Sequence, residues 1–204
     1  MFTKAKIFDL AANALLLTRR FIDPDTDKSN EAKVFLTNYD IALRSTLEDL
    51  DLDSTSDVKT LELVEEDPND QWLFAYKYPS NCAIFRRIQS TELMDNRYSH
   101  IPRRIGMYEG QKVIFTNEAD AIAEYVAYDV PLSSLSANAG LAVAYKLATL
   151  SAPLITGKGA QKLIEAIQAK YIVAKAEAQE KDKNENFNYV EDHISSEFVA
   201  ARTS

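Results

Sequence analysis

The stretch that decides the fold begins at Tyr108-Glu-Gly-Gln-Lys-Val-Ile-Phe-Thr-Asn117 and continues through Tyr125-Val-Ala-Tyr-Asp-Val-Pro131 to an Ala-rich block that ends in Ala152-Pro-Leu-Ile-Thr-Gly157. Apolar runs on both sides of Glu109 and Gly110 predict a hairpin with the glycine in its turn. Residues 119–129 fit either a strand or a helix. A proline and two helical patterns follow. Few side chains of catalytic type occur here, so we expect this stretch to pack and assemble.

Apolar residues at helical spacing predict four helices in the chain. These helices cover residues 3–20, 31–50, 132–150 and 159–183. The first two precede a strand-rich segment and the last two follow it. The expected fold class is therefore α+β but mainly α: a helical bundle of about four helices with an inserted strand-rich β element and an extended C-terminal arm.

The β insertion is predicted over residues 59–129. Within it, Gln71–Tyr78 alternates aromatic and other side chains, which predicts a strand with one aromatic face. Residues 51–57 are acidic and rich in Ser and Thr, which indicates a loop, and residues 66–70 indicate a turn. Residues 1–183 then form one domain. Residues 184–204 are polar with scattered apolar side chains, and we expect them to be an arm that orders on a partner.

Composition limits the classes of function. The chain has 204 residues, 46% of them hydrophobic, and a formal net charge of -8. Proteins that bind duplex DNA tightly usually carry a basic surplus, so sequence-specific DNA binding is disfavoured. An acidic surface would instead repel DNA that passes by it. No signal peptide and no apolar run of membrane-spanning length is recognisable, so we expect a soluble intracellular protein.

No arrangement of side chains predicts catalysis or a bound metal. His100 and His193 are far apart and lack a ligand or triad partner at motif spacing. Cys82 is the single cysteine, which excludes an internal disulfide and indicates a buried thiol. The acidic group Glu65, Glu66, Asp67 and Asp70 lacks the ligand alternation of a calcium loop. We therefore expect no enzyme, no cofactor and no metal.

Charged and aromatic residues of the strand-rich segment are candidates for contacts with other molecules. Five arginines concentrate there, and inter-subunit contacts are favoured over DNA-proximal contacts for them because the chain is acidic: Arg86, Arg87, Arg97, Arg103 and Arg104. The aromatic strand contributes Trp72 and Tyr76. Core packing is the default for these two rings, and a subunit interface is the alternative.

Three motifs give the chain a resemblance to a known family. The first is Trp72-Leu-Phe-Ala-Tyr-Lys-Tyr-Pro-Ser-Asn-Cys82 followed by Ile-Phe-Arg-Arg-Ile. The second is the junction from Ile114 to Pro131, with Tyr125-Val-Ala-Tyr-Asp-Val-Pro131 at its end. The third is Ala142-Val-Ala-Tyr-Lys-Leu-Ala148, then Ala152-Pro-Leu-Ile-Thr-Gly157 and a helix with Tyr171. Together they resemble the head-to-tail adaptors of short-tailed phages, the family of tail tubular protein A and related gateway proteins.

The resemblance implies a structural virion protein. Members form a homo-oligomeric ring, commonly of twelve copies, beneath the portal protein. The ring extends the DNA channel, takes part in DNA ejection without sequence-specific DNA binding, and docks tail or nozzle proteins. Its helices pack side by side between subunits, and assembly in the host cytoplasm precedes incorporation into the virion. The C-terminal arm reaches the portal, and its expected anchors are Phe187, Tyr189, Ile194, Phe198 and Val199.

Two other classes of function remain open at this stage. The chain could be a non-viral protein-binding helical module, which would bind one partner without forming a ring. It could also be a small metal-dependent hydrolase that uses Glu65, Asp67 and Asp70. A second carboxylate or His cluster at ligand spacing is lacking, which disfavours the hydrolase.

Overall fold

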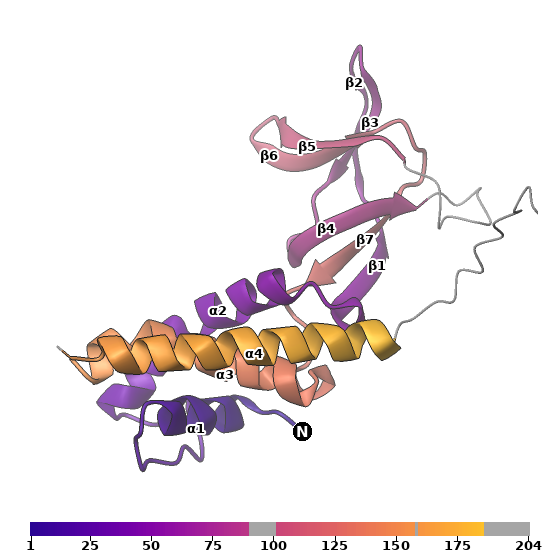
Figure 1. The fold of residues 1–204 in the computed structure, drawn as a ribbon. Helices are drawn as coiled ribbons and strands as arrows, with labels where there is room; N and C mark the ends of the chain where they lie inside the picture. Colours follow the sequence, from indigo (N-terminus) through magenta and orange to yellow (C-terminus); the bar gives the residue numbers. More distant parts are fainter. Residues whose placement is uncertain (90–100, 158, 186–204) are drawn as a thin grey trace, which may run out of the picture.

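A computed structural model describes residues 1–89, 101–157 and 159–185 of the chain. This part contains four α-helices and seven β-strands, and Figure 1 shows the helices at one end of the molecule and the strands at the other. We call these ends the helical part and the β part. None of the described helices combines the length and the apolar character needed to cross a membrane.

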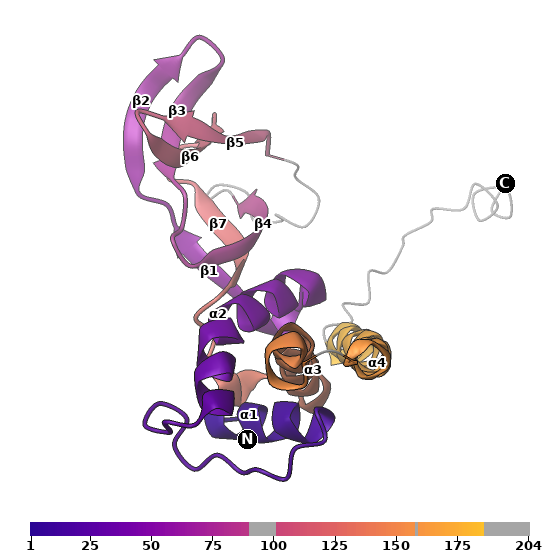
Figure 2. The same cartoon turned by 90° about the vertical axis from the view of Figure 1, so that its left-hand side faces the viewer.

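The helical part consists of α1 (Lys4–Ala14), α2 (Asn30–Leu50), α3 (Ala137–Ile155) and α4 (Gln161–Glu185). Helix α3 lies at its centre and contacts the other three helices, and Figure 2 shows α4 on the outside beside α3. Hydroxyl side chains cap three of the helices, because Thr3, Ser29 and Ser136 accept a hydrogen bond from the amide three residues ahead.

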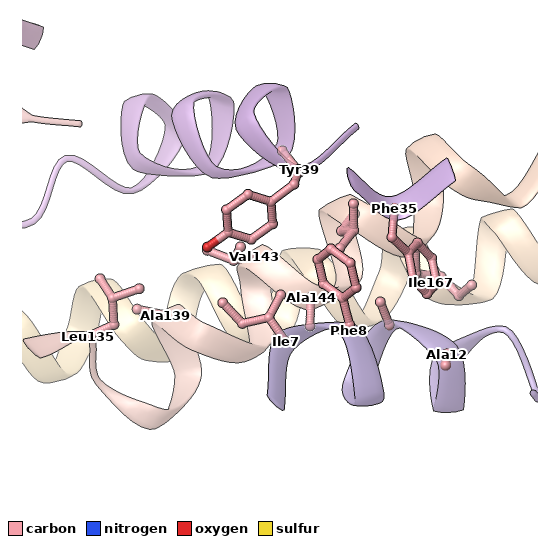
Figure 3. Close-up of a cluster of buried hydrophobic side chains, with 14 of the residues drawn as sticks. Ile7, Phe8, Ala12, Phe35, Tyr39, Leu135, Ala139, Val143, Ala144 and Ile167 are labelled. Atoms are coloured by element: carbon pink, nitrogen blue, oxygen red, sulfur yellow. The ribbon is translucent and has the colours of Figure 1, made fainter. Parts of the chain in front are cut away.

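The core of the helical part combines large aromatic rings with a face of small side chains. Phe8 meets Phe35 and Phe21 edge to face, with ring centroids 5.4 and 5.7 Å apart. The Phe8 ring also meets the Tyr39 ring (Figure 3). Helix α3 brings small buried residues into the same cluster as these rings, which lets the helices approach closely: Ala139, Val143, Ala144, Ala148 and Ala152.

Two of the predicted helices have different ends in the structure. The first helix ends at Ala14 and not at residue 20, because Leu16 takes a left-handed conformation with φ 62°. The third begins after a 3-10 turn at Leu132–Ser134 and runs on through Pro153 to Ile155. Pro153 lies in the last turn and removes one hydrogen bond of the helix, yet the helix continues past it, and the Thr156 amide bonds to the Ala152 carbonyl.

Seven strands form two antiparallel sheets in the β part. Sheet A has the order β1-β7-β4, and sheet B has the order β2-β3-β6-β5. The strands are β1 (Ser56–Thr60), β2 (Leu63–Asn69), β3 (Trp72–Lys77), β4 (Cys82–Gln89), β5 (Arg103–Tyr108), β6 (Gln111–Thr116) and β7 (Ile122–Ala127). The predicted hairpin is β5–β6. Its two-residue turn has φ 47° at Glu109 and 80° at Gly110, which a twisted antiparallel pair requires.

The expected fold class, a mainly α helical bundle with a β insertion, is wrong. The strands are not a small insertion in a helical bundle. They form two sheets, and these sheets have hydrophobic cores separate from the helical core. The first of these cores is built around Tyr76, Ile114 and Tyr125. Residues 51–57 and 66–70 were expected as loop and turn, yet β1 and β2 extend into them. Both are edge strands with mostly exposed side chains, so they lack the alternation that marks a half-buried strand.

Replacement of Phe8 with Ala is expected to lower the free energy of unfolding by about 3 to 5 kcal/mol, because it opens a cavity among the rings of Phe21, Phe35 and Tyr39. Urea denaturation followed by circular dichroism measures this change. The matched control is Leu16→Ala, which removes an exposed side chain near the end of the same helix. Equal losses in the two variants would contradict this description of the core.

Candidate functional site

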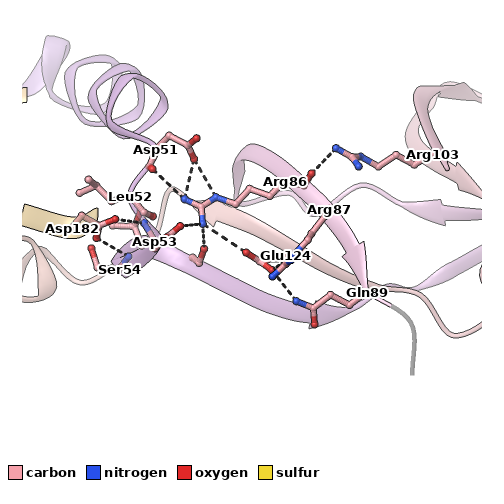
Figure 4. Close-up of polar contacts among 12 residues, drawn as sticks. Asp51, Leu52, Asp53, Ser54, Arg86, Arg87, Gln89, Arg103, Glu124 and Asp182 are labelled. Carbon is pink, nitrogen blue, oxygen red and sulfur yellow. Dashed lines mark hydrogen bonds and ion pairs between the residues drawn. The ribbon is translucent and has the colours of Figure 1, made fainter. Parts of the chain in front are cut away.

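Where the helical and β parts join, the guanidinium of Arg86 lies among carboxylates (Figure 4). Arg86 reaches from β4 and its side chain is only 16% exposed. It donates to Asp51 Oδ1 at 3.0 Å and to Ser56 Oγ at 2.8 Å. It also pairs with Asp53, and Glu124 Oε1 lies 3.7 Å away. These residues come from α2's end, β1, β4 and β7, so this side chain ties the two parts together.

Electrostatics favour the charged state of this arginine. Burial alone would disfavour the guanidinium cation, but the bonds and charges of Asp51 and Asp53 outweigh it and raise the pKa of Arg86 above its ordinary value. Asp51 occupies a left-handed conformation with φ 47° at the end of α2. The turn that ends α2 therefore presents both the carboxylate and the carbonyl of Asp51 to Arg86.

Two further arginines in the predicted set, Arg87 and Arg103, are also bound within the chain, although the Arg87 side chain is 42% exposed. Arg87 donates to Glu124 Oε2 at 2.6 Å, and that oxygen also accepts from Gln89. Arg103 on β5 lies over the ring of Phe85, 5.2 Å from its centroid, and donates to the Arg86 carbonyl. Both side chains therefore have partners within their own chain.

The remaining arginines differ from these. Arg104 is exposed on β5, at the edge of sheet B. Arg97 lies outside the described residues. Of the arginines that the sequence predicted for contacts with other molecules, the described structure places Arg104 on an open edge and leaves Arg87 partly exposed.

The aromatic candidates Trp72 and Tyr76 lie inside the β part. Tyr76 is buried, donates to the Glu118 carbonyl at 3.1 Å, and has a pKa raised by burial. Trp72 is half-buried, packs against the small cluster of Ala75, Val113 and Phe115, and its indole Nε1 is buried without a partner in the described structure. Core packing, the default expectation, describes both rings.

The C-terminal half of α4 is held by polar contacts that the sequence did not predict. Asp182, which is buried, accepts from the amides of Asp53 and Ser54 at 2.6 and 3.0 Å. Gln179 donates to the carbonyls of Asp49 and Leu50. These bonds satisfy backbone groups at the end of α2 and the start of the following 3-10 turn. A buried Asp within a charged stretch of helix has no periodic signal that would reveal it.

The middle of the outer face of α4, from Ala169 to Ala176, is apolar and uncovered in the described structure. Ala169, Ile172, Val173 and Ala176 recur at spacings of three and four residues, which places them on one line of the helix. All four are exposed, Ile172 by 65% and Val173 by 56%. The opposite side carries Ile167, Ala174 and Ala178, which are buried against the rest of the helical part. Beside this line, a groove of about 310 Å³ runs between α4 and α3, lined in part by Leu141 and Tyr145.

The described residues hold no group of three or more His, Cys, Asp and Glu side chains that could bind a metal ion. The acidic residues Glu65, Glu66 and Asp67 are exposed along β2. Cys82 is buried, and this burial raises the pKa of its thiol, which disfavours the nucleophilic thiolate. The two histidines and all five expected arm anchors lie outside the described residues: His100, His193, Phe187, Tyr189, Ile194, Phe198 and Val199.

Comparison with known proteins gives no match to any family model, and none of the curated proteins is significantly similar to the chain.

The contact between Asp49 and α4 predicts an acid-sensitive step in stability. Burial would raise the pKa of Asp49, but the hydrogen bond from Tyr171 (2.6 Å) and the charges of Lys146 and Lys175 lower it overall. Because the folded pKa lies below the unfolded value of about 3.9, the unfolded chain binds more protons. This contribution is therefore complete above about pH 5 and is lost as the pH falls through the folded pKa.

Urea denaturation of the native chain and of Asp49→Asn across that pH range checks this sign. The native chain is expected to be the more stable of the two at pH 6, and the difference should shrink on acidification. A difference that is constant with pH would contradict it. Asp70→Asn, a change at an exposed acid in the β2–β3 turn, is the control.

Proposed function

We propose that this chain is a structural virion protein, a head-to-tail adaptor of a short-tailed phage that assembles into a ring beneath the portal protein. The ring, with twelve copies as the expected number, extends the DNA channel and docks the tail. The observation that carries this proposal is the outer face of α4. Where a helix is apolar on two opposite sides, as α4 is between Ala169 and Ala176, both sides are usually buried, and the chain itself covers one of them.

In a ring, a neighbouring copy of the chain would cover the outer face of α4. Side-by-side packing of helices between copies would bury Ile172 and Val173 and fill the groove beside Tyr145. Apolar and aromatic side chains are the usual centres of such contacts. The net charge of -8 suits a passage for DNA, because an acidic protein does not retain the phosphate backbone.

In this proposal the C-terminal arm binds the portal. Helix α4 ends at Glu185, and the segment that follows carries the five expected anchors, Phe187, Tyr189, Ile194, Phe198 and Val199, within an otherwise polar sequence. A module that binds a single partner through the arm would leave the outer face of α4 uncovered. In the adaptor proposal, the outer face of α4 forms the contacts of the ring and the arm binds the portal.

Val173→Glu is expected to abolish rings, because it places a charge in the centre of the apolar line. Native mass spectrometry and electron microscopy of the purified chain, alone and with portal protein, measure ring formation. Gln168→Glu adds the same charge to an exposed position of α4 outside the line and should leave rings intact. A native chain that stays monomeric and ignores the portal would refute the adaptor.

A chain that ends at Glu185 is expected to form rings and to lose portal binding. The lost segment contains the proposed anchors, whereas the face of α4 is retained. Pull-down of the ring by portal protein, with the full chain as reference, measures the effect. Undiminished portal binding by the shortened chain would contradict the role assigned to the arm.

A further inference from the structure

Sheet B ends in two strands that each pair on one side only within the described structure, β2 and β5. Their outer edges carry backbone N–H and C=O groups that can accept another strand. Regular pairing along β5 covers all six residues from Arg103 to Tyr108 without a bulge. Along β2 the pairing with β3 is interrupted, and Asp67, with φ 49°, and Pro68 limit the outer edge to its first four residues.

The rows of residues that cross sheet B join these two edges in a specific way. The registers of three strand pairs can be followed from β2 through β3 and β6 to β5. Each row then has one residue at each edge of the sheet. The three rows are Leu63–Tyr76–Ile114–Ile105, Glu65–Ala75–Phe115–Arg104 and Glu66–Phe74–Thr116–Arg103.

The two ends of every row are complementary in chemistry. One row has an exposed apolar residue at each end, Leu63 and Ile105. The other two have an acid on β2 and an arginine on β5. Strand β2 contains three acidic residues and no basic one, and β5 contains two arginines and no acidic residue. If β5 of one copy paired with β2 of the next, each row would continue across the contact. Opposite charges would then face each other in two rows, and apolar side chains in the third.

We propose that β2 of one copy adds to the edge of β5 of the next copy, so that sheet B continues between copies. All neighbours in this sheet are antiparallel, so β2 and β5 run in opposite directions and the added strand is antiparallel too. This register sets Leu63 opposite Ile105 and Glu65 opposite Arg104 across the contact.

Glu65 and Arg104 form the principal charged pair of the contact. Both side chains are exposed in the single copy. Arg103 already lies over Phe85 and donates to the Arg86 carbonyl, so it faces its own sheet A rather than Glu66 of a neighbour. Because the contact joins two different edges, it is heterologous, and such a contact closes into a ring or continues as a filament.

This inference rests on the proposed self-assembly, but it does not require a portal. Its test uses the full chain alone, by sedimentation velocity and native mass spectrometry up to the solubility limit. Glu65→Arg and Arg104→Glu each place like charges across the contact, and each is expected to weaken association about tenfold or more. Their exposed positions leave the fold of the single copy unchanged, which circular dichroism checks.

Charge restoration gives the sharpest outcome. The double variant E65R/R104E, and an equimolar mixture of the two single variants, both restore opposite charges at every contact and should recover association. The control is Asp70→Arg, a charge reversal beyond the last row, which should have no effect. A monomeric native chain, as expected if a strand of another protein occupies β5, would overturn the inference.

The outcomes separate this inference from the adaptor role. Rings that form equally well in the single variants would overturn the strand contact but not the adaptor role. The same holds if association lost in the single variants returns neither in their mixture nor in the double variant. Assembly that follows the charge pattern while the ring ignores the portal would remove the adaptor and keep the strand contact.

Discussion

One partly buried cation, the guanidinium of Arg86, determines how the helical and β parts meet. Its donors reach the carboxylate and the carbonyl of Asp51 at the end of α2, Ser56 at the start of β1, and Asp53 between them. A desolvated charge is costly unless it is paired and fully hydrogen-bonded. These groups therefore hold one relative position, and the strands that follow start from it.

Helix α4 depends on the same junction. Asp182 binds the amides of Asp53 and Ser54, the residues next to the arginine site, and Gln179 binds carbonyls at the end of α2. The N-terminal half of α4 is held by apolar packing of Ile167 and the C-terminal half largely by these polar bonds. The outer face of α4, which carries the adaptor proposal, thus has a fixed orientation relative to the β part.

Periodicity predicted the elements that have one clearly buried side. The aromatic alternation around Trp72 and the Glu109-Gly110 turn marked β3 and the β5–β6 hairpin, because burial and turn geometry both leave local signals. The strands β1 and β2 lack such a signal, since an edge strand with exposed side chains resembles an acidic loop. The sequence shows that arginines concentrate in this segment, but it does not show their partners. Arg86 binds Asp51 and Arg103 lies over Phe85, and no local pattern in the sequence indicates either contact. Only the fold shows which arginines are bound within the chain and which stay exposed.

The end of α4 determines how a force on the C-terminal segment reaches the rest of the molecule. The chain leaves this helix at Glu185, one turn beyond Asp182, whose carboxylate bonds to the backbone next to Arg86. A pull on the C-terminal segment therefore acts on the Asp182 bonds, which lie next to the arginine site. Helix α4 also packs into the core around Phe8 through Ile167 and Ala178, so this core shares the load. The segment after Glu185 and the β part are therefore connected through the end of α4 and the groups around Arg86.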